Sequence, residues 1–204
     1  KVGHTGTLDP KATGLLLLCT GRATKQIEQL MLDRKEYVAT LKFGATTPSF
    51  DLEHPEDAHY PYEHITQGML EEALREFLGT TLQVPPIFSA VSVGGKRAYD
   101  LARKGKDCQL EGKPITIHEL EVVSFEPPYA TLRISCGKGT YIRSLARDLG
   151  ERLHSGAYLT SLRRTQLGSV RVEDSLTLAE LPDFLAHAEL NEEGFDPIVP
   201  PTSK

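Results

Sequence analysis

A loop rich in turn-forming residues, followed at once by an apolar run, opens the chain and constrains its fold more than any other feature. Residues 3–10 read Gly-His-Thr-Gly-Thr-Leu-Asp-Pro, and four leucines stand at 15–18. Glycine and proline favour turns, so the pattern predicts a shaped loop that leads into a buried strand at residues 15–20. Such loops often carry catalytic side chains, and Asp9 is the carboxylate of this one. The alternative is that Asp9 only closes a turn before Pro10.

Hydrophobic periodicity predicts strands and helices beyond this loop. Residues 36–43 place apolar side chains at every second position, as in a strand, whereas residues 67–78 carry them at helical spacing. By these criteria strands are expected at 15–20, 36–43, 115–125, 130–136 and 157–162, and helices at 22–32, 67–78 and 140–153. These elements do not alternate as regular βαβ units. The pattern therefore predicts an α+β fold with a mixed, largely antiparallel central sheet flanked by helices.

Charge is unevenly distributed along the 204 residues, which suffice for one sizeable core. The formal net charge of −5 argues against nucleic acid, because phosphate binding depends on lysine and arginine. However, residues 130–170 hold seven cationic side chains against two carboxylates, whereas residues 51–76 hold eight carboxylates against one arginine. Such segregation permits a basic face, although a charge run is most often only a solvated surface.

The sequence carries no signature of a metal site, a cofactor or a membrane span. It lacks a P-loop, a dinucleotide glycine fingerprint, a G-x-S-x-G motif and zinc-ligand spacing. Its longest apolar run falls far short of the roughly 20 residues of a membrane helix. Cys19 and Cys136 are expected as buried thiols, which fits a reducing cytoplasm. An acidic loop carries three histidines that are expected to be solvated: His54, His59 and His64.

Several segments resemble the pseudouridine synthases of the B type, a family that converts uridine 55 in the T arm of tRNA. Residues 3–10 match the G-H-x-G-x-L-D-P loop of that family. Residues 136–143 resemble its C-S-K-G-T-Y-I-R segment, with Gly137 in place of the usual serine. Matches of the same kind occur at 21–25, 83–90 and 158–165, and the resemblance extends to about residue 170. It implies the catalytic fold of this family, without cofactor or metal.

The resemblance implies roles for three residues at the reaction centre. Asp9 corresponds to the nucleophile, Arg143 to the arginine that pairs with it, and Tyr37 to a tyrosine that stacks on the target base near C5. The chemistry is sensible, because a carboxylate can add to the sugar C1′ or to the base C6 and later leave. A guanidinium can fix that carboxylate, and a tyrosine ring can stack on a flipped uracil. Without the motif, Arg143 would be an exposed helix residue and Tyr37 a core residue.

Four further residues correspond to substrate-binding positions of the family. His4 corresponds to a residue that assists base extrusion, which costs a few kcal/mol of lost stacking. Tyr141 and Leu162 correspond to residues that line the uracil pocket. Lys25 lies in the G-x-A-T-K element and presents a cation to the RNA at a helix start.

The resemblance also implies a domain organisation. Residues 1–175 correspond to the catalytic domain, and an N-terminal family segment with a K-P-x-G-x-(S/T)-S element is expected before residue 1. Within this domain, residues 83–113 correspond to an insertion that closes on the T arm. Residues 176–204 have room for a helix and a loose tail in place of the larger C-terminal RNA-binding module of many members. The expected partner is the T arm of tRNA, bound by a cytoplasmic monomer.

Two other functions fit the same segments. A non-catalytic protein that binds the T arm and assists tRNA folding would also need a pocket for a flipped base. It would have no use for an ionised carboxylate that faces RNA phosphates, so Asp9, Tyr37 and Arg143 favour the enzyme. A guide-RNA-dependent pseudouridine synthase has a similar catalytic loop, but it normally carries extra partner-binding segments that are not found in this sequence.

Overall fold

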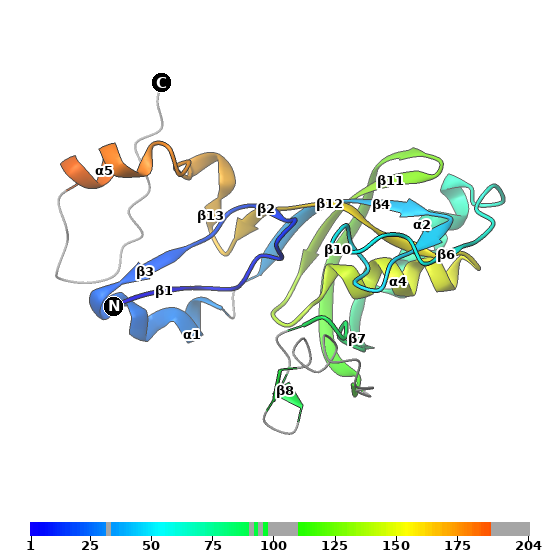
Figure 1. Cartoon of the computed structure of the whole chain (residues 1–204), viewed down its shortest axis with the longest axis horizontal. Coiled ribbons are helices and arrows are strands. Elements are labelled where there is room, and N and C mark those ends of the chain that lie inside the picture. The colour runs from blue at the N-terminus through cyan, green and yellow to red at the C-terminus, as the bar shows by residue number, and fades with distance from the viewer. Residues whose placement is uncertain (32–33, 90–91, 94–95, 98–109, 189–204) are drawn as a thin grey trace.

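A mixed seven-stranded sheet forms the centre of the molecule (Figure 1). The computed structural model describes residues 1–31, 34–89, 92–93, 96–97 and 110–188. The strands of the sheet are β2 Thr13–Gly14, β4 Lys35–Phe43, β7 Gly79–Gln83, β10 Lys113–Glu126, β11 Tyr129–Cys136, β12 Ala157–Leu167 and β13 Val170–Arg171. Their order is β13–β12–β4–β11–β10–β7 with antiparallel neighbours, and β2 adds to β12 in parallel. The predicted α+β fold with a largely antiparallel sheet is confirmed.

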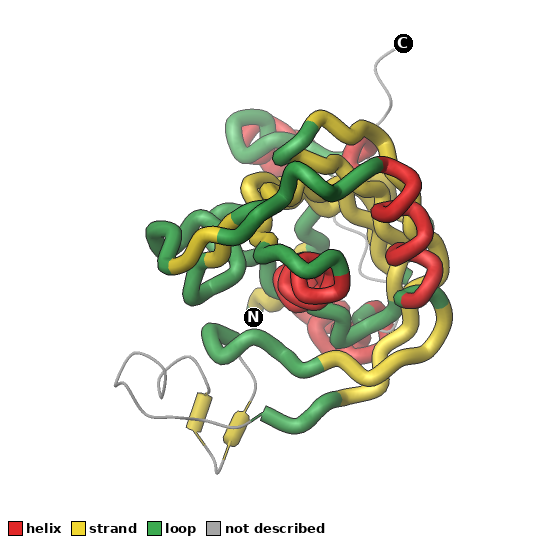
Figure 2. The backbone as a smooth tube through the Cα atoms, turned by 90° about the vertical axis from the view of Figure 1, so that its right-hand side faces the viewer, coloured by secondary structure: helices red, strands yellow, loops and turns green. Residues whose placement is uncertain are grey.

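Helices α2 Gln67–Glu76 and α4 Ile142–Arg152 cover one face of this sheet. α2 packs on β10, and α4 packs on β12 and β4. Figure 2 shows α4 nearly end-on, inside the curve of the strands. Along β4 every second side chain is buried against these helices, as its alternation predicts. Each large apolar side chain buried in this way contributes about 1.5–3 kcal/mol relative to an exposed one.

A small two-stranded sheet lies to one side of the main sheet, at the left of Figure 1. It pairs β1 Val2–His4 with β3 Leu18–Thr20, and the 3₁₀ helix η1 Gly21–Gln26 and the short helix α1 Ile27–Leu30 follow. We refer to these four elements as the N-terminal arm. The expected helix at 22–32 is thus mostly a 3₁₀ helix, because no residue of η1 or α1 is buried against a core that would stabilise a longer α-helix.

The predicted buried strand at residues 15–20 is only partly correct. Leu15 and Cys19 are buried, whereas Leu16 and Leu18 are exposed. Only the last three residues of the run form a strand, and that strand pairs with β1 alone. The run is therefore not a central strand, since a strand buried on both faces needs neighbours and cover that this segment does not have.

The remaining elements are short. They are β5 Ala45–Thr46 paired with β6 Ala58–His59, β8 Ser92–Val93 paired with β9 Lys96–Arg97, the 3₁₀ helix η2 Val172–Asp174, and helix α5 Leu181–His187. The expected loose tail falls beyond residue 188, outside the described residues, and so does Cys108. Cys19 and Cys136 are buried free thiols, as predicted. None of the described helices is long and apolar enough to cross a membrane.

Candidate active site

A buried arginine of β12, Arg164, fastens the loop at residues 5–17 to the sheet. Its side chain is 1% exposed and donates from Nε to the Leu15 carbonyl at 2.7 Å and from Nη2 to the Gly6 carbonyl at 3.1 Å. The Leu15 N–H donates in turn to the Arg164 carbonyl at 2.9 Å. Gly14 has a φ of 102°, and a Cβ there would lie 2.2 Å from the Arg164 carbonyl oxygen. The backbone of the loop can therefore lie this close to β12 only with glycine at position 14. The loop is thus held against β12 on both sides of Asp9.

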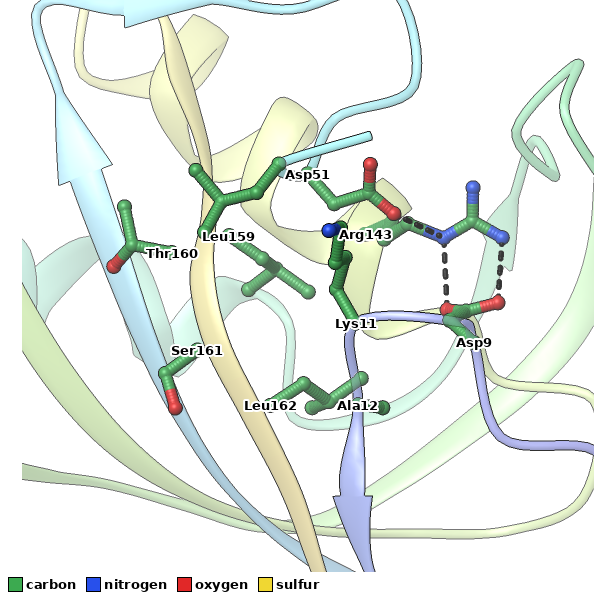
Figure 3. Close-up of a pocket in the computed structure, with 10 residues that line it drawn as sticks. Asp9, Lys11, Ala12, Asp51, Arg143, Leu159, Thr160, Ser161 and Leu162 are labelled. Atoms are coloured by element: carbon green, nitrogen blue, oxygen red, sulfur yellow. Dashed lines mark hydrogen bonds and ion pairs between the residues drawn. The ribbon is translucent and has the colours of Figure 1, made fainter. Parts of the chain in front are cut away.

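Asp9 and Arg143 form a bidentate ion pair beside this loop (Figure 3). Arg143 stands in the first turn of α4, and its Nε and Nη2 donate to Oδ2 and Oδ1 of Asp9, each at 2.9 Å. The Arg143 side chain is 5% exposed and that of Asp9 31% exposed. Two charge-assisted bonds fix both the position and the rotation of a carboxylate. The structure therefore joins these two predicted site residues and presents Asp9 at a partly accessible position.

Arg143 also holds two further segments of the chain. Its Nη1 donates to the Ser49 carbonyl at 3.2 Å and to the Phe88 carbonyl at 3.0 Å. Ser49 belongs to the loop at residues 47–54, and Phe88 to the first part of the predicted insertion. One guanidinium thus connects the loop that carries Asp9, the 47–54 loop and the base of the insertion.

A second carboxylate, Asp51, lies beside this pair and was not identified from the sequence. Its Oδ1 accepts from the Ser49 hydroxyl at 2.6 Å and from the Glu53 N–H at 2.9 Å. Its Oδ2 is buried without a hydrogen-bond partner and lies 3.8 Å from Nε of Arg143. In the sequence Asp51 is one of eight carboxylates in an acidic stretch, and nothing in the local pattern distinguishes it from the other seven.

These side chains line a narrow pocket with a cavity volume of about 20 Å³, room for about one water molecule (Figure 3). β12 forms one wall, and the loops that carry Asp9 and Asp51 form the others. The lining residues are Asp9, Lys11, Ala12, Asp51, Leu52, Arg143, Leu159, Thr160, Ser161 and Leu162. Leu162, one of the predicted substrate-binding residues, is thus found at the pocket, where it forms an apolar wall beside the polar pair.

Tyr37 stands in the middle of the sheet and is not among the residues that line the pocket. It stands on β4 opposite Arg164 of β12 and is 8% exposed. Burial raises the pKa of Tyr37 to about 12, an increase that the nearby thiol of Cys136 reinforces and a hydrogen bond with Arg164 partly offsets. Tyr37 is therefore a neutral phenol at physiological pH.

Tyr141 occupies the N-cap position of α4, directly before the first helical turn. The buried side chain of Gln83 makes two hydrogen bonds to the backbone of Tyr141. Its Oε1 accepts from the Tyr141 N–H at 2.8 Å, and its Nε2 donates to the Tyr141 carbonyl at 3.1 Å. Burial raises the pKa of Tyr141 above its ordinary value. Gln83 thus fixes the start of the helix that carries Arg143.

His4 and Lys25 do not line the pocket. Both are exposed and lie on the N-terminal arm, where Nδ1 of His4 accepts from the Gly6 N–H at 3.4 Å. Lys25 stands in the last turn of η1. The structure leaves both side chains open to a large partner and does not bring them into contact with Asp9.

The predicted insertion at residues 83–113 is only partly described. Its first residues are anchored to α4, because the Val84 carbonyl accepts from the Ser144 hydroxyl at 2.8 Å and from Nη2 of Arg147 at 3.0 Å. Residues 98–109 of the insertion lie outside the described residues. The described residues contain no cluster of three or more side chains that could hold a metal ion.

Comparison with known proteins identifies the family. Residues 1–142 match the TruB family pseudouridylate synthase N-terminal domain, and residues 143–204 match the tRNA pseudouridylate synthase B C-terminal domain. A Phocaeicola vulgatus protein named tRNA pseudouridine synthase B is 56% identical over 192 residues, which cover 94% of this chain and 82% of that protein. A Bacteroides thetaiotaomicron protein of the same name is 54% identical over 197 residues, covering 95% of this chain and 82% of that one.

Solved structures agree with this assignment. The chain resembles one in the crystal structure of a Cbf5-Nop10-Gar1 complex, with a TM-score of 0.66 and 29% identity, over 91% of this chain and 46% of that one. It also resembles one in the structure of an H/ACA RNP bound to a substrate RNA containing 2′-deoxyuridine, with a TM-score of 0.65 and 26% identity, over 91% of this chain and 44% of that one. The chain belongs to the TruB family of pseudouridylate synthases.

Proposed function

We propose that the chain converts uridine to pseudouridine in tRNA, that its target is uridine 55 of the T arm, and that Asp9 is the nucleophile. The observation that carries the proposal is the Asp9 carboxylate, held by two hydrogen bonds from Arg143 at a pocket between two loops and β12. The relatives named tRNA pseudouridine synthase B support the reaction and tRNA as the substrate.

The reaction rearranges one nucleotide and needs no external reactant. The bond between N1 and C1′ breaks, the base turns, and a bond forms between C5 and C1′. C5 then loses its hydrogen as a proton, and N1 of the product carries one. A carboxylate serves this sequence as a nucleophile that adds to C1′ or to C6 and is later expelled. Asp9 is suited to that role because its bonds to Arg143 fix it while leaving it partly accessible.

In this proposal Tyr37 stacks on the base and does not accept a proton. A phenol whose pKa is about 12 is a poor proton acceptor at neutral pH. Its aromatic face offers stacking area to an extruded uracil. Leu162 and Tyr141 complete the apolar surroundings of the base, and exclusion of water there strengthens the interaction between Asp9 and Arg143.

The pocket must widen before a base can enter. Its cavity of about 20 Å³ holds about one water molecule. Leu52 of the 47–54 loop and Leu162 of β12 line the pocket from different elements, so entry of a uracil requires these elements to separate. Binding of the rest of the RNA would provide the free energy that this opening requires.

The rest of the T arm is bound outside the pocket. His4 and Lys25 of the N-terminal arm are exposed, and we assign His4 to the space that the extruded nucleotide leaves and Lys25 to the phosphate backbone. The insertion at 83–113, whose base is bonded to α4 and to Arg143, closes on the RNA. The protein acts as a monomer in the cytoplasm.

The position of the product tests the proposed target. Unmodified tRNA transcripts are incubated with the protein, and pseudouridine is mapped by carbodiimide modification and primer extension. The proposal predicts one stop, at position 55, in the full transcript and in an isolated T-arm hairpin. A transcript with cytidine at position 55 should give no stop. Stops at several positions, or only at another position, would contradict the assignment to uridine 55.

A further inference from the structure

A chain of polar contacts runs from a histidine at the surface to the pair of Asp9 and Arg143. His54 is half-buried at the end of the 47–54 loop, and its Nδ1 lies 3.0 Å from the Ser49 hydroxyl oxygen. Ser49 is completely buried and donates to Oδ1 of Asp51 at 2.6 Å. The other oxygen of Asp51 lies 3.8 Å from Nε of Arg143. The expectation that all three histidines of the acidic loop are solvated is therefore wrong for His54.

The number of hydrogens fixes the direction of these bonds. A serine hydroxyl has one hydrogen, and a carboxylate only accepts. The Ser49 hydrogen therefore points to Asp51, and the Ser49 oxygen has to accept from His54. Nδ1 of His54 consequently carries a hydrogen whether the ring is neutral or charged.

These bonds fix Asp51 in an ion pair with Arg143 that leaves the Nε hydrogen bond of Arg143 to Asp9. Nε of Arg143 donates to Asp9, and the unpartnered Oδ2 of Asp51 lies just beyond hydrogen-bond distance from the same nitrogen. A small rotation of Asp51 would bring Oδ2 within range of that donor. The bonds from Ser49 and from the Glu53 N–H to Oδ1 oppose this rotation.

The His54 ring also supports the other side of Arg143. It packs on the Phe88 ring with centroids 4.8 Å apart and an angle of 39° between the planes. The carbonyl of Phe88 accepts from Nη1 of Arg143. His54 thus contacts two residues, Ser49 and Phe88, whose carbonyls both bind the guanidinium on the side away from Asp9.

We propose that His54 is a positioning residue of the active site: its Nδ1–H holds Ser49, and through Ser49 it keeps Asp51 from rotating onto the Nε–H of Arg143, so that Arg143 stays paired with Asp9. This inference rests on the proposed role of Asp9 as the nucleophile. If it is correct, loss of the His54 hydrogen bond slows the chemical step and leaves the affinity for RNA unchanged.

Two variants separate the hydrogen bond from the ring packing. His54→Phe keeps an aromatic ring against Phe88 but removes the donor, and His54→Asn restores an N–H close to the place of Nδ1 but removes the ring. His59→Phe is the matched control, since the His59 side chain is 76% exposed in the same segment. Each variant is compared with the parent chain in single-turnover conversion of tRNA, in filter binding of tRNA and in thermal unfolding.

We expect His54→Phe to lower the single-turnover rate by about fivefold to tenfold, the equivalent of one hydrogen bond. Its dissociation constant for tRNA should stay within about twofold of that of the parent chain, and His54→Asn should recover most of the rate. His59→Phe should behave as the parent chain does. An unchanged rate in His54→Phe, or equal losses in His54→Phe and His54→Asn, would overturn the proposal.

A measurement that does not depend on activity distinguishes this proposal from the proposed function. In ¹⁵N-labelled protein, the Nε–H resonance of Arg143, assigned by its loss in Arg143→Lys, reports the bond to Asp9. His54→Phe should shift this resonance or speed its hydrogen exchange, whereas His54→Asn should leave it near the parent position. If the parent chain forms no pseudouridine, the proposed function fails. The resonance still decides whether His54 positions Arg143, since an unchanged signal in His54→Phe would refute it.

Discussion

Arg143 is the side chain on which the candidate site depends most, because it connects parts of the chain that are distant in sequence. Its partners Asp9, Ser49 and Phe88 are 134, 94 and 55 residues away. Its position in the first turn of α4 is in turn fixed by the bonds of Gln83 to the Tyr141 peptide. A change at Arg143 therefore alters both the orientation of Asp9 and the contact between two loops.

Arg143→Lys should show whether the reaction needs only the positive charge of Arg143 or also its paired hydrogen bonds to Asp9. Lysine keeps the positive charge but cannot donate two parallel bonds to Asp9 and also bind the carbonyls of Ser49 and Phe88 on the other side. We expect the single-turnover rate to fall by about 100-fold, which corresponds to about 3 kcal/mol of activation free energy. The affinity for tRNA, measured by filter binding, should change by less than about threefold. A rate close to the parent value would show that the bidentate geometry is unimportant.

The pH at which Tyr37 ionises reports how deeply its hydroxyl is buried. Because burial raises its pKa to about 12, Tyr37 should ionise well above the ordinary tyrosine value near 10. The raised pKa means that the folded state resists ionisation, so stability is fully present below about pH 10 and is lost as the pH rises toward 12. In a spectrophotometric titration at about 295 nm, Tyr37→Phe should remove absorbance gained near pH 12. Loss of a step near the ordinary value would instead place Tyr37 in contact with solvent.

The sequence could identify some of these residues and not others. Asp9 and Arg143 stand in motifs, so the family resemblance predicted their pairing, and the structure has it. Asp51 and His54 lie in an acidic loop with no distinctive pattern. Their importance comes from contacts that only the fold creates, of Asp51 with Arg143 of α4 and of His54 with Ser49 and Phe88. Arg164 was visible as part of a matching block, but its bonds to the catalytic loop depend on the placement of β2 beside β12.

At the scale of elements, the candidate site depends on how the loop that carries Asp9 is attached to β12. The short parallel pairing of β2 with β12 places Gly14 against the backbone of Arg164. The Arg164 side chain then reaches across the loop to the Gly6 carbonyl, so a single residue of β12 contacts both ends of the segment that carries Asp9. A rigid strand thereby holds the loop that carries Asp9 in place.

Gly14→Ala should disrupt this attachment. A Cβ at this position would lie 2.2 Å from the Arg164 carbonyl oxygen, and the φ of 102° is unfavourable for alanine. We expect the free energy of unfolding, measured in urea, to fall by about 2–4 kcal/mol. Gly68→Ala is the matched control: Gly68 lies in α2, where an added methyl group would point into open space, and the change should be neutral or stabilise by up to about 1 kcal/mol. Equal stabilities for the two variants would contradict the described approach of β2 to β12.

Prediction of the elements succeeded where the local pattern and the tertiary environment agree. The alternation at residues 36–43 predicted β4, which is a strand with neighbours on both sides and helices over one face. The leucines at 15–18 suggested a similar strand, but only one short partner pairs with that segment, and its alternate leucines face solvent. Hydrophobicity alone does not say how many neighbours a strand will have.

At the scale of the whole molecule, most cations of the basic stretch at residues 130–170 do not contribute to a free basic face. Five of the seven cations at residues 130–170 are engaged within the protein. Four pair with carboxylates, namely Arg133, Arg143, Arg147 and Arg152, and Arg164 is bonded to backbone carbonyls. Among the described cations, Lys138 and Arg163 of this stretch and Lys25 of the N-terminal arm remain exposed and available to RNA.

The salt dependence of RNA binding tests this view. Lys25→Gln should remove one phosphate contact, which weakens tRNA binding and lowers the slope of log affinity against log salt by about 0.7–0.9. The single-turnover rate at saturating protein should not change. Arg75→Gln, at an exposed position of α2 within the acidic stretch, is the control and should leave the slope unaltered. An unchanged slope in Lys25→Gln would remove the N-terminal arm from the RNA interface.

Asp9 is proposed to perform the chemistry of uridine isomerisation. Release of tritium from tRNA labelled at C5 of uridine, compared between the parent chain and Asp9→Asn, tests this role. C5 loses its hydrogen only once the new bond to C1′ has formed. We predict release of about one tritium per tRNA by the parent chain, and none by Asp9→Asn, which should still bind the T arm. Release by Asp9→Asn would place the nucleophile elsewhere, and binding without release by the parent chain would indicate a non-catalytic RNA-binding protein.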